Sequence, residues 1–155
     1  MIYYELHDNI CVKKEISAPV FDESFDVIVS MDSMYFAKDM TAFVASIRKW
    51  LKPGGVLFVA YQEGDVVDKT ENTETTLFAD AMKANGWDYE VSDITKDSYD
   101  VLVKKREVAL KYKDALEKEG YSEWADLLVM QTDYINDGYD EYSKNLSRYI
   151  YVAKK

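Results

Sequence analysis

The order of hydrophobic and polar residues in the first half of the chain predicts two buried strands with an amphipathic helix between them. Residues 25–30 (FDVIVS) are almost continuously apolar, broken only by Asp26, which is typical of a parallel strand covered on both faces. Asp39 can cap the helix, which residues 52–55 (KPGG) end before the second strand at residues 56–61. This order predicts a βαβ unit with parallel strands. The apolar stripe of the helix comprises Met40, Phe43, Val44, Ile47 and Leu51.

Shorter strands and one further short helix extend this α/β pattern. Residues 11–17 (CVKKEIS), 87–94 (WDYEVSDI) and 148–155 (RYIYVAKK) have the composition of strands, with β-branched and aromatic residues most frequent in the last. A helix before the second of these strands ends at Gly86. The apolar residues of this helix are Leu77, Phe78, Ala81 and Met82.

Two longer helical patterns fill the region between the last two strands. In the first, apolar residues repeat every seven positions up to Gly120, which ends the helix. Ser122 can cap the second. The repeating positions of the first helix are Leu102, Ala109 and Leu116, with Val101, Val108, Tyr112 and Ala115 beside them. The second carries Trp124, Leu127, Leu128, Gln131, Tyr134 and Ile135.

Length and charge limit the classes of function. A chain of 155 residues is expected to form one domain with a real core. Its formal net charge of −10 argues against nucleic acid or an anionic membrane as a partner, because both would repel it at long range. The acidity is also what a well-solvated surface gives.

Cysteine and histidine usage excludes two further kinds of site. Cys11 and His7 are the only residues of their types, so the chain has neither an internal disulfide nor a four-ligand zinc site made of Cys and His. No apolar run approaches the ~18 residues of a membrane span, and the first residues lack the pattern of a secretory signal. A protein of the reducing cytoplasm, without a metal, is expected.

Two spaced motifs resemble the second half of the Rossmann-like S-adenosylmethionine-dependent methyltransferases. In that family a Leu-Pro-Phe-type turn precedes Phe-Asp at the head of the fourth strand, and LKPGG precedes the fifth. Here residues 18–21 (APVF) stand at the first place, Phe25-Asp26 follows, and LKPGG occupies residues 51–55. The resemblance covers residues 11–92 and the terminal strand. It implies an α/β fold with a partial Rossmann-like sheet, flanking helices and a helical insertion at about residues 98–147 before the last strand.

The family's cofactor loop has no counterpart in this sequence. The family holds its cofactor with a Gly-rich turn after the first strand and with an acid at the end of the second. Gly54 and Gly55 are the only adjacent glycines here, and they follow Pro53 where the helix ends. Only glycine lets the backbone approach a ligand so closely. We therefore expect a single domain, residues 1–155, that is a truncated methyltransferase in which binding of S-adenosylmethionine is impaired.

Two candidate cofactor-binding residues follow from the resemblance near the start of the chain. Glu15 resembles the acid that accepts the adenine amino group, in a register uncertain by one residue. Ile16 would then offer its backbone amide to the adenine ring. The alternative for Glu15 is an exposed acid at the end of a strand.

The end of the strand at residues 25–30 supplies the candidate catalytic and pocket residues. Asp32 would orient the nucleophile or accept its proton, and Ser33 is a candidate cofactor contact, because ligands of open α/β sheets bind at the carboxyl ends of strands. A helix-capping or loop role is the alternative for Asp32. Tyr35, Phe36 and Tyr61 could line the substrate pocket, where aromatic faces attract cationic groups. They could instead be core or rim aromatics.

Two classes of function remain open. The first is a methyltransferase, or a fragment of one, that acts on a small molecule. The second is a non-catalytic remnant that serves as an interaction or dimerisation module. Residues 25–30 would have an open apolar edge, which either residues 2–16 or a second copy could cover. We expect a homodimer, because the N-terminal segment has poor apolar alternation.

Overall fold

The computed structural model describes the backbone of residues 2–7 and 10–15 and both backbone and side chains of residues 21–155. The described chain divides into two compact units. The first comprises Met1–Tyr61, Thr70–Ser92 and Ile150–Lys155, and the second comprises Gln62–Lys69 and Asp93–Tyr149. Each unit is described by itself below. The single-domain organisation stays a prediction.

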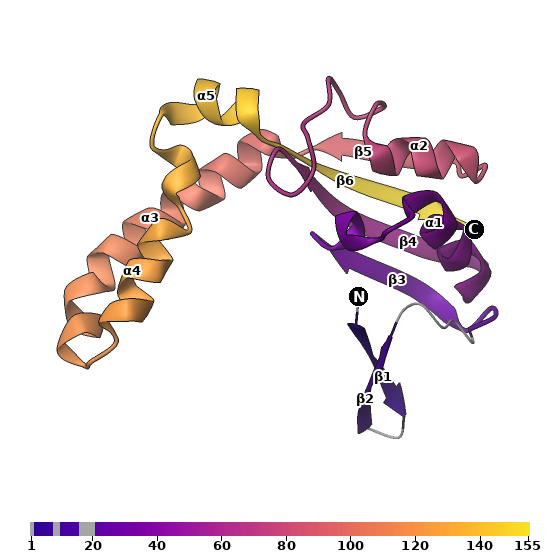
Figure 1. Ribbon diagram of the computed structural model, residues 1–155, viewed down its shortest axis with the longest axis horizontal. Helices are drawn as coiled ribbons and strands as arrows, with labels where there is room; N and C mark the ends of the chain where they lie inside the picture. The colour runs from indigo at the N-terminus through magenta and orange to yellow at the C-terminus, as the bar shows by residue number, and fades with distance from the viewer. Residues whose placement is uncertain (1, 8–9, 16–20) are drawn as a thin grey trace. The chain divides into compact units, whose positions relative to one another are not determined.

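A four-stranded sheet organises the α/β part of the chain (Figure 1). Its strands follow the order β3 (Phe25–Met31), β4 (Leu51–Glu63), β6 (Ser147–Lys154) and β5 (Tyr89–Asp93). The strands β3 and β4 are parallel, as the βαβ pattern predicted. The mixed α/β architecture with flanking helices confirms the fold class predicted from the sequence.

The helix between the parallel strands begins and packs as its pattern predicted. In α1 (Met40–Trp50), the Asp39 side chain accepts a hydrogen bond from the Ala42 amide at 2.9 Å. The side chains buried on its apolar face are Val44, Ile47 and Trp50. Leu51 belongs to β4, so the helix is one residue shorter than its apolar stripe indicated.

A second helix of this unit lies beside α1. In α2 (Leu77–Ala84), the Thr76 hydroxyl accepts a hydrogen bond from the Ala79 amide at 2.9 Å. The Asn85 side chain, just after α2, donates to the Thr41 carbonyl oxygen of α1 at 3.0 Å. This bond joins the end of one helix to the start of the other.

The LKPGG sequence forms the start of β4 and not a separate turn, which corrects the sequence analysis. The pairing register shifts between Phe25 and Val27 of β3, so the two strands are irregular at this point. Gly54 has a φ of +79°, the left-handed conformation expected of a glycine here. A Cβ atom on Gly55 would lie 2.9 Å from the Lys52 carbonyl oxygen. Gly55 is therefore required by the close approach of backbone within the strand pair.

One face of the sheet forms the core, and the other is more open. Along β6, buried and less buried residues alternate, with Tyr151 on the buried side. On β3, Val27, Val29 and Met31 are 56%, 59% and 58% exposed. The expectation that both faces of β3 are covered is therefore wrong for the residues that the structure describes.

The strand β3 also lies at one end of the sheet order. Its described pairing is with β4 alone. The strands β1 (Ile2–His7) and β2 (Ile10–Glu15) form a separate antiparallel hairpin. Within the described residues, one edge of β3 thus has no neighbouring strand.

The second unit is mostly helical, as the two long patterns predicted. It contains α3 (Thr95–Lys118), α4 (Ser122–Met130), the short η2 (Asp133–Ile135) and α5 (Gly138–Asn145). The helices α3 and α4 lie side by side (Figure 1). Among the residues with described placement, no helix is long and apolar enough to cross a membrane.

Two details of these helices differ from the prediction. Tyr121 is the N-cap of α4 and Ser122 is already helical, so Ser122 makes no capping hydrogen bond. The second helical pattern, expected to run to Ile135, ends at Met130. The Thr132 hydroxyl there donates to the Val129 carbonyl oxygen at 2.6 Å, which offers the backbone an alternative to the helix.

Candidate functional site

Asp32 follows directly after β3 and has an unusual backbone conformation. Its φ is +48°, in the left-handed region, which Asp tolerates better than most residues. Its amide donates to the carbonyl oxygen of Ala60 on β4 at 3.0 Å. The two parallel strands therefore hold Asp32 at their carboxyl ends, the edge where ligands of open α/β sheets bind.

The side chains of Asp32 and Ser33 differ in what they can offer to a ligand. Asp32 is half-buried, and its Oδ1 atom is shielded from solvent. The Ser33 hydroxyl lies 2.8 Å from the Ser30 hydroxyl, within hydrogen-bonding distance. A bound molecule would therefore meet a carboxylate from Asp32 and a hydroxyl pair from the two serines.

Aromatic rings form the next layer of the candidate site, on and behind the short helix η1 (Met34–Phe36). The ring centroids of Tyr35 and Phe36 are 4.9 Å apart in an edge-on arrangement. Phe36 is 59% exposed, whereas Tyr61 is fully buried. The rings of Tyr35 and Tyr61 are 6.1 Å apart, and Tyr61 stacks on Phe78 of α2. Tyr61 thus supports Tyr35 from the core, and Phe36 presents its ring to solvent.

Of the two candidate adenine contacts, the structure describes only the backbone of Glu15. Glu15 is the last residue of β2, where its backbone pairs with Ile2. Ile16 lies outside the described residues. Their proposed contacts with the cofactor stay predictions, as do the roles of the residues after β3.

The surroundings of the glycines show whether the chain has a turn that could hold S-adenosylmethionine, the cofactor of the methyltransferases that the sequence resembles. Among the six glycines of the sequence, Gly64 alone directly follows a strand. A Cβ on Gly64 would lie 1.8 Å from the Asn145 carbonyl oxygen, so protein backbone fills the space beside it. Gly55 is likewise committed to packing within β4. These two glycines do not fit a cofactor-cradling turn.

Sequence reasoning missed the left-handed turn that carries Asp32. A signal for it was present, because Met31-Asp32-Ser33 ends an apolar strand with the residue types that favour local turns.

In residues 21–155, no three His, Cys, Asp or Glu side chains are grouped as metal ligands would be.

Comparison with known proteins finds similarity to methyltransferases. A family model described as "Methyltransferase domain" matches residues 5–59. Phosphoethanolamine N-methyltransferase 3 of Arabidopsis thaliana is 35% identical over 88 residues, which are 56% of this chain and 16% of that protein. The chain therefore spans about a sixth of the length of this curated relative.

Two solved structures share the fold. Phosphoethanolamine N-methyltransferase 2 of Haemonchus contortus, in complex with S-adenosyl-L-methionine, has a TM-score of 0.71 at 22% identity. The match covers 90% of this chain and 35% of that one. A putative sarcosine dimethylglycine methyltransferase from Galdieria sulphuraria has a TM-score of 0.62 at 14% identity, and covers 90% and 56% of the two chains.

The sequence match and the shared fold confirm the resemblance noted from the two motifs. The methyltransferase-domain match covers residues 5–59, about a third of the chain, and the fold is shared with solved methyltransferases.

Proposed function

We propose that this chain provides the acceptor side of a methyltransferase site that uses S-adenosylmethionine and acts on a small molecule. The observation that carries the proposal is the position of Asp32 at the carboxyl end of β3, fixed to β4 by the Ala60 hydrogen bond. The helix η1, which carries Tyr35 and Phe36, begins two residues after Asp32. A carboxylate and aromatic rings, carried within five residues after β3, suit an acceptor that becomes more cationic as it reacts.

A small amine is the acceptor class that this arrangement and the similar proteins favour. The Arabidopsis relative is by its name a phosphoethanolamine N-methyltransferase, and so is the Haemonchus structure. S-adenosylmethionine, when bound, supplies the methyl group as a sulfonium. The Asp32 carboxylate would accept a hydrogen bond from the amine N–H, orient the nitrogen and take its proton. The exposed Phe36 ring would face the methylated ammonium.

Cofactor affinity should be low in the isolated chain. None of its glycines fits a cofactor-cradling turn, so the contacts at Ser33, and the candidate contacts at Glu15 and Ile16, would have to hold the cofactor. The remaining contacts would come from another polypeptide or from a second copy of the chain. We place this activity in the cytoplasm, in keeping with the single cysteine, Cys11.

A second copy is the partner that we propose for β3. In the described part of the chain, one edge of β3 has no strand beside it, and the side chains of Val27, Val29 and Met31 are exposed. Asp26 is the one charged residue in the strand, and it forms an ion pair with Lys52 at 2.8 Å. Natural proteins rarely leave such an edge uncovered, and pairing about a two-fold axis would cover it in both copies.

The same observations support an alternative function without catalysis. A chain that lacks a cofactor turn but presents an apolar strand edge could act as an interaction or dimerisation module. The two functions differ in one respect that is easy to measure. The module would bind no S-adenosylmethionine at any concentration, whereas the enzyme would bind it weakly and transfer its methyl group.

Calorimetric titration and mass spectrometry together test the proposal. We expect S-adenosylmethionine to bind with a dissociation constant weaker than ~100 μM. At millimolar cofactor, phosphoethanolamine should gain 14 mass units per methyl group, an increment fixed by replacing hydrogen with methyl. Folded protein that gives no product with phosphoethanolamine, ethanolamine or glycine would reject the enzyme in favour of the module. Micromolar cofactor binding would contradict the low affinity inferred from the glycines.

A further inference from the structure

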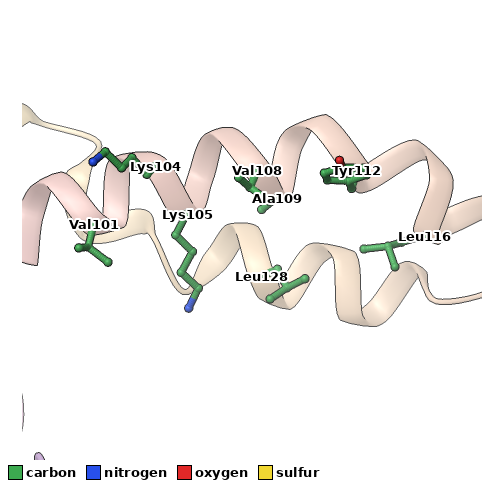
Figure 2. A pocket seen from close by; sticks show the side chains of 8 residues that line it. All are labelled: Val101, Lys104, Lys105, Val108, Ala109, Tyr112, Leu116 and Leu128. Carbon is green, nitrogen blue, oxygen red and sulfur yellow. The ribbon is translucent and has the colours of Figure 1, made fainter.

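An open apolar groove runs along the helices α3 and α4 of the second unit (Figure 2). It has a volume of about 620 Å³, within the roughly 300–1,000 Å³ typical of small-molecule sites. Its apolar lining comprises Val101, Val108, Ala109, Tyr112 and Leu116 of α3 and Leu128 of α4. The groove is independent of the residues proposed for methyl transfer.

The groove follows from the heptad pattern of α3. Ala109 is buried and Leu116 is half-buried along this pattern. Val108 and Tyr112, one position before Ala109 and three after it, are 56% and 51% exposed, and Val101 is 62% exposed. The stripe that contains Ala109 and Leu116 is thus only partly covered. The neighbouring stripe of Val101, Val108 and Tyr112 is exposed and open to a ligand. A contiguous apolar surface of this kind commonly marks a binding site.

Two cations line the same groove. Figure 2 shows Lys104 and Lys105 near the end that carries Val101, with Leu116 at the opposite end. Neither lysine has a carboxylate within 4.0 Å in the described part of the chain, and Lys105 donates to the neutral Gln131 side chain at 2.7 Å.

Lys104 and Lys105 form no ion pair in the described part of the chain, although Asp100 and Glu107 lie one helical turn from Lys104 on α3. Two other cations of α3 do form ion pairs: Arg106 pairs with Asp133 at 3.0 Å, and Lys113 pairs with Asp126 at 2.6 Å. The two groove lysines thus keep their charge available to an anionic ligand.

We propose that the α3–α4 groove binds a free single-chain amphiphile with an anionic head group, such as a fatty acid. The aliphatic chain would lie along the groove from Val108 towards Leu116, and the head group would lie at Lys105, whose side chain points towards α4, with Lys104 on the other side of α3 at the same end (Figure 2). From Lys105 to Leu116, α3 rises about 16 Å at ~1.5 Å per residue, which is long enough to hold an extended aliphatic chain.

A second copy of the chain fits this groove less well. A two-fold interface places the same surface on both partners and must be complementary to itself. A second copy would also bring the same pair of lysines to the groove, and like charges would then face each other. An anionic amphiphile instead matches both the apolar lining and the positive charge.

Calorimetric titration of the full chain with dodecanoate below its micelle concentration tests this proposal. We expect one dodecanoate per chain, with weaker binding of the uncharged dodecyl maltoside and of the cationic dodecyltrimethylammonium. Replacing both lysines, Lys104→Ala with Lys105→Ala, should weaken dodecanoate binding at least 10-fold and remove its salt dependence. Val108→Glu should abolish binding, because it puts a carboxylate inside the groove. Lys118→Ala, outside the groove on the same helix, is the matched control and should bind as the unchanged chain does.

Several results would overturn the proposal. The three amphiphiles could bind equally, or the double lysine variant could bind dodecanoate unchanged while circular dichroism shows intact helices. Light scattering could show that Val108→Glu converts a dimer to a monomer, which would make a second copy the occupant. Binding to anionic phospholipid vesicles without saturable binding of dodecanoate would point to a membrane surface instead.

Discussion

The amide of Asp32 donates a hydrogen bond to the carbonyl oxygen of Ala60 at 3.0 Å, while the Asp32 backbone has a φ of +48°. This bond ties the residue after β3 to β4 at the position proposed to orient the acceptor nitrogen. The surrounding structure constrains a left-handed residue that is hydrogen-bonded to a neighbouring strand. This constraint fixes the direction in which the Asp32 side chain leaves the backbone.

The left-handed conformation predicts an unusual order of stability at this position. Asp32→Ala should be less stable than Asp32→Gly by about 1 kcal/mol, because glycine adopts a positive φ without steric cost and alanine does not. Urea denaturation of the two variants measures the difference directly. An alanine variant at least as stable as the glycine variant would show that the turn does not have this conformation.

The close approach at Gly55 predicts a packing defect. Gly55→Ala should lower the free energy of unfolding by about 1–3 kcal/mol, since the new Cβ would lie 2.9 Å from the Lys52 carbonyl oxygen. Gly86→Asn is the control. Gly86 has a φ of +64°, which Asn tolerates, and no atom within 4 Å of its Cβ position. Equal stability of the two variants in urea would contradict the assigned packing.

The proposed dimer predicts that one charge on β3 should separate the two copies. Light scattering at micromolar concentration should give twice the chain mass of 18.0 kDa for the unchanged protein and 18.0 kDa for Val29→Lys. Leu77→Lys is the matched control, because Leu77 is 56% exposed on α2 and lies outside β3. A monomer in the unchanged protein would reject the dimer.

Alkaline pH should weaken the helical unit through Tyr142. Burial raises the pKa of Tyr142 above its ordinary value of 10.0, although the nearby charge of Arg148 acts in the opposite direction. The folded state therefore keeps this proton to a higher pH than the unfolded state does. The associated stability is complete below pH 10 and is lost as the pH rises through the folded pKa.

A variant without the phenol group isolates this contribution. Between pH 8 and pH 11, the urea midpoint of Tyr142→Phe should fall less than that of the unchanged protein, with the ring contact to Tyr99 retained. Burial also raises the pKa of Tyr149, so some decline should remain. Identical declines in both proteins would show that Tyr142 ionises equally easily in the folded and unfolded states.

Local patterns sufficed to predict the parallel strand pair and the helix between them. Continuous apolar residues define β3, and helical spacing together with the Asp39 cap defines α1, so neighbouring residues alone determine these elements. The β4 start was harder, because Pro53 and Gly54 look like a turn when read without the partner strand. Pairing with β3 extends the strand back to Leu51.

The helical unit shows a second limit of sequence reasoning. Gly120 ends α3 as expected, but its φ of +87° lets α4 begin after a single residue, Tyr121, and leaves no place for a Ser122 cap. Thr132 signalled the break that follows α4. The apolar spacing continued past Thr132 to Ile135 and concealed the break.

For the candidate site, the sequence indicated which residues follow β3 but not how their side chains lie. The burial of Tyr61 depends on Phe78, which is distant in sequence. The α3–α4 groove likewise requires both helices in place. Such features arise from contacts between elements, and no single segment reveals them.

The rate of methyl transfer to phosphoethanolamine, measured for the unchanged chain and for Asp32→Asn at saturating S-adenosylmethionine, tests the proposed function most directly. Asn tolerates the left-handed backbone but cannot take a proton. We predict that kcat falls by roughly 100-fold while the free energy of unfolding changes by less than about 0.5 kcal/mol. No transfer by the folded, unchanged chain, or equal rates for both proteins, would contradict the role assigned to Asp32.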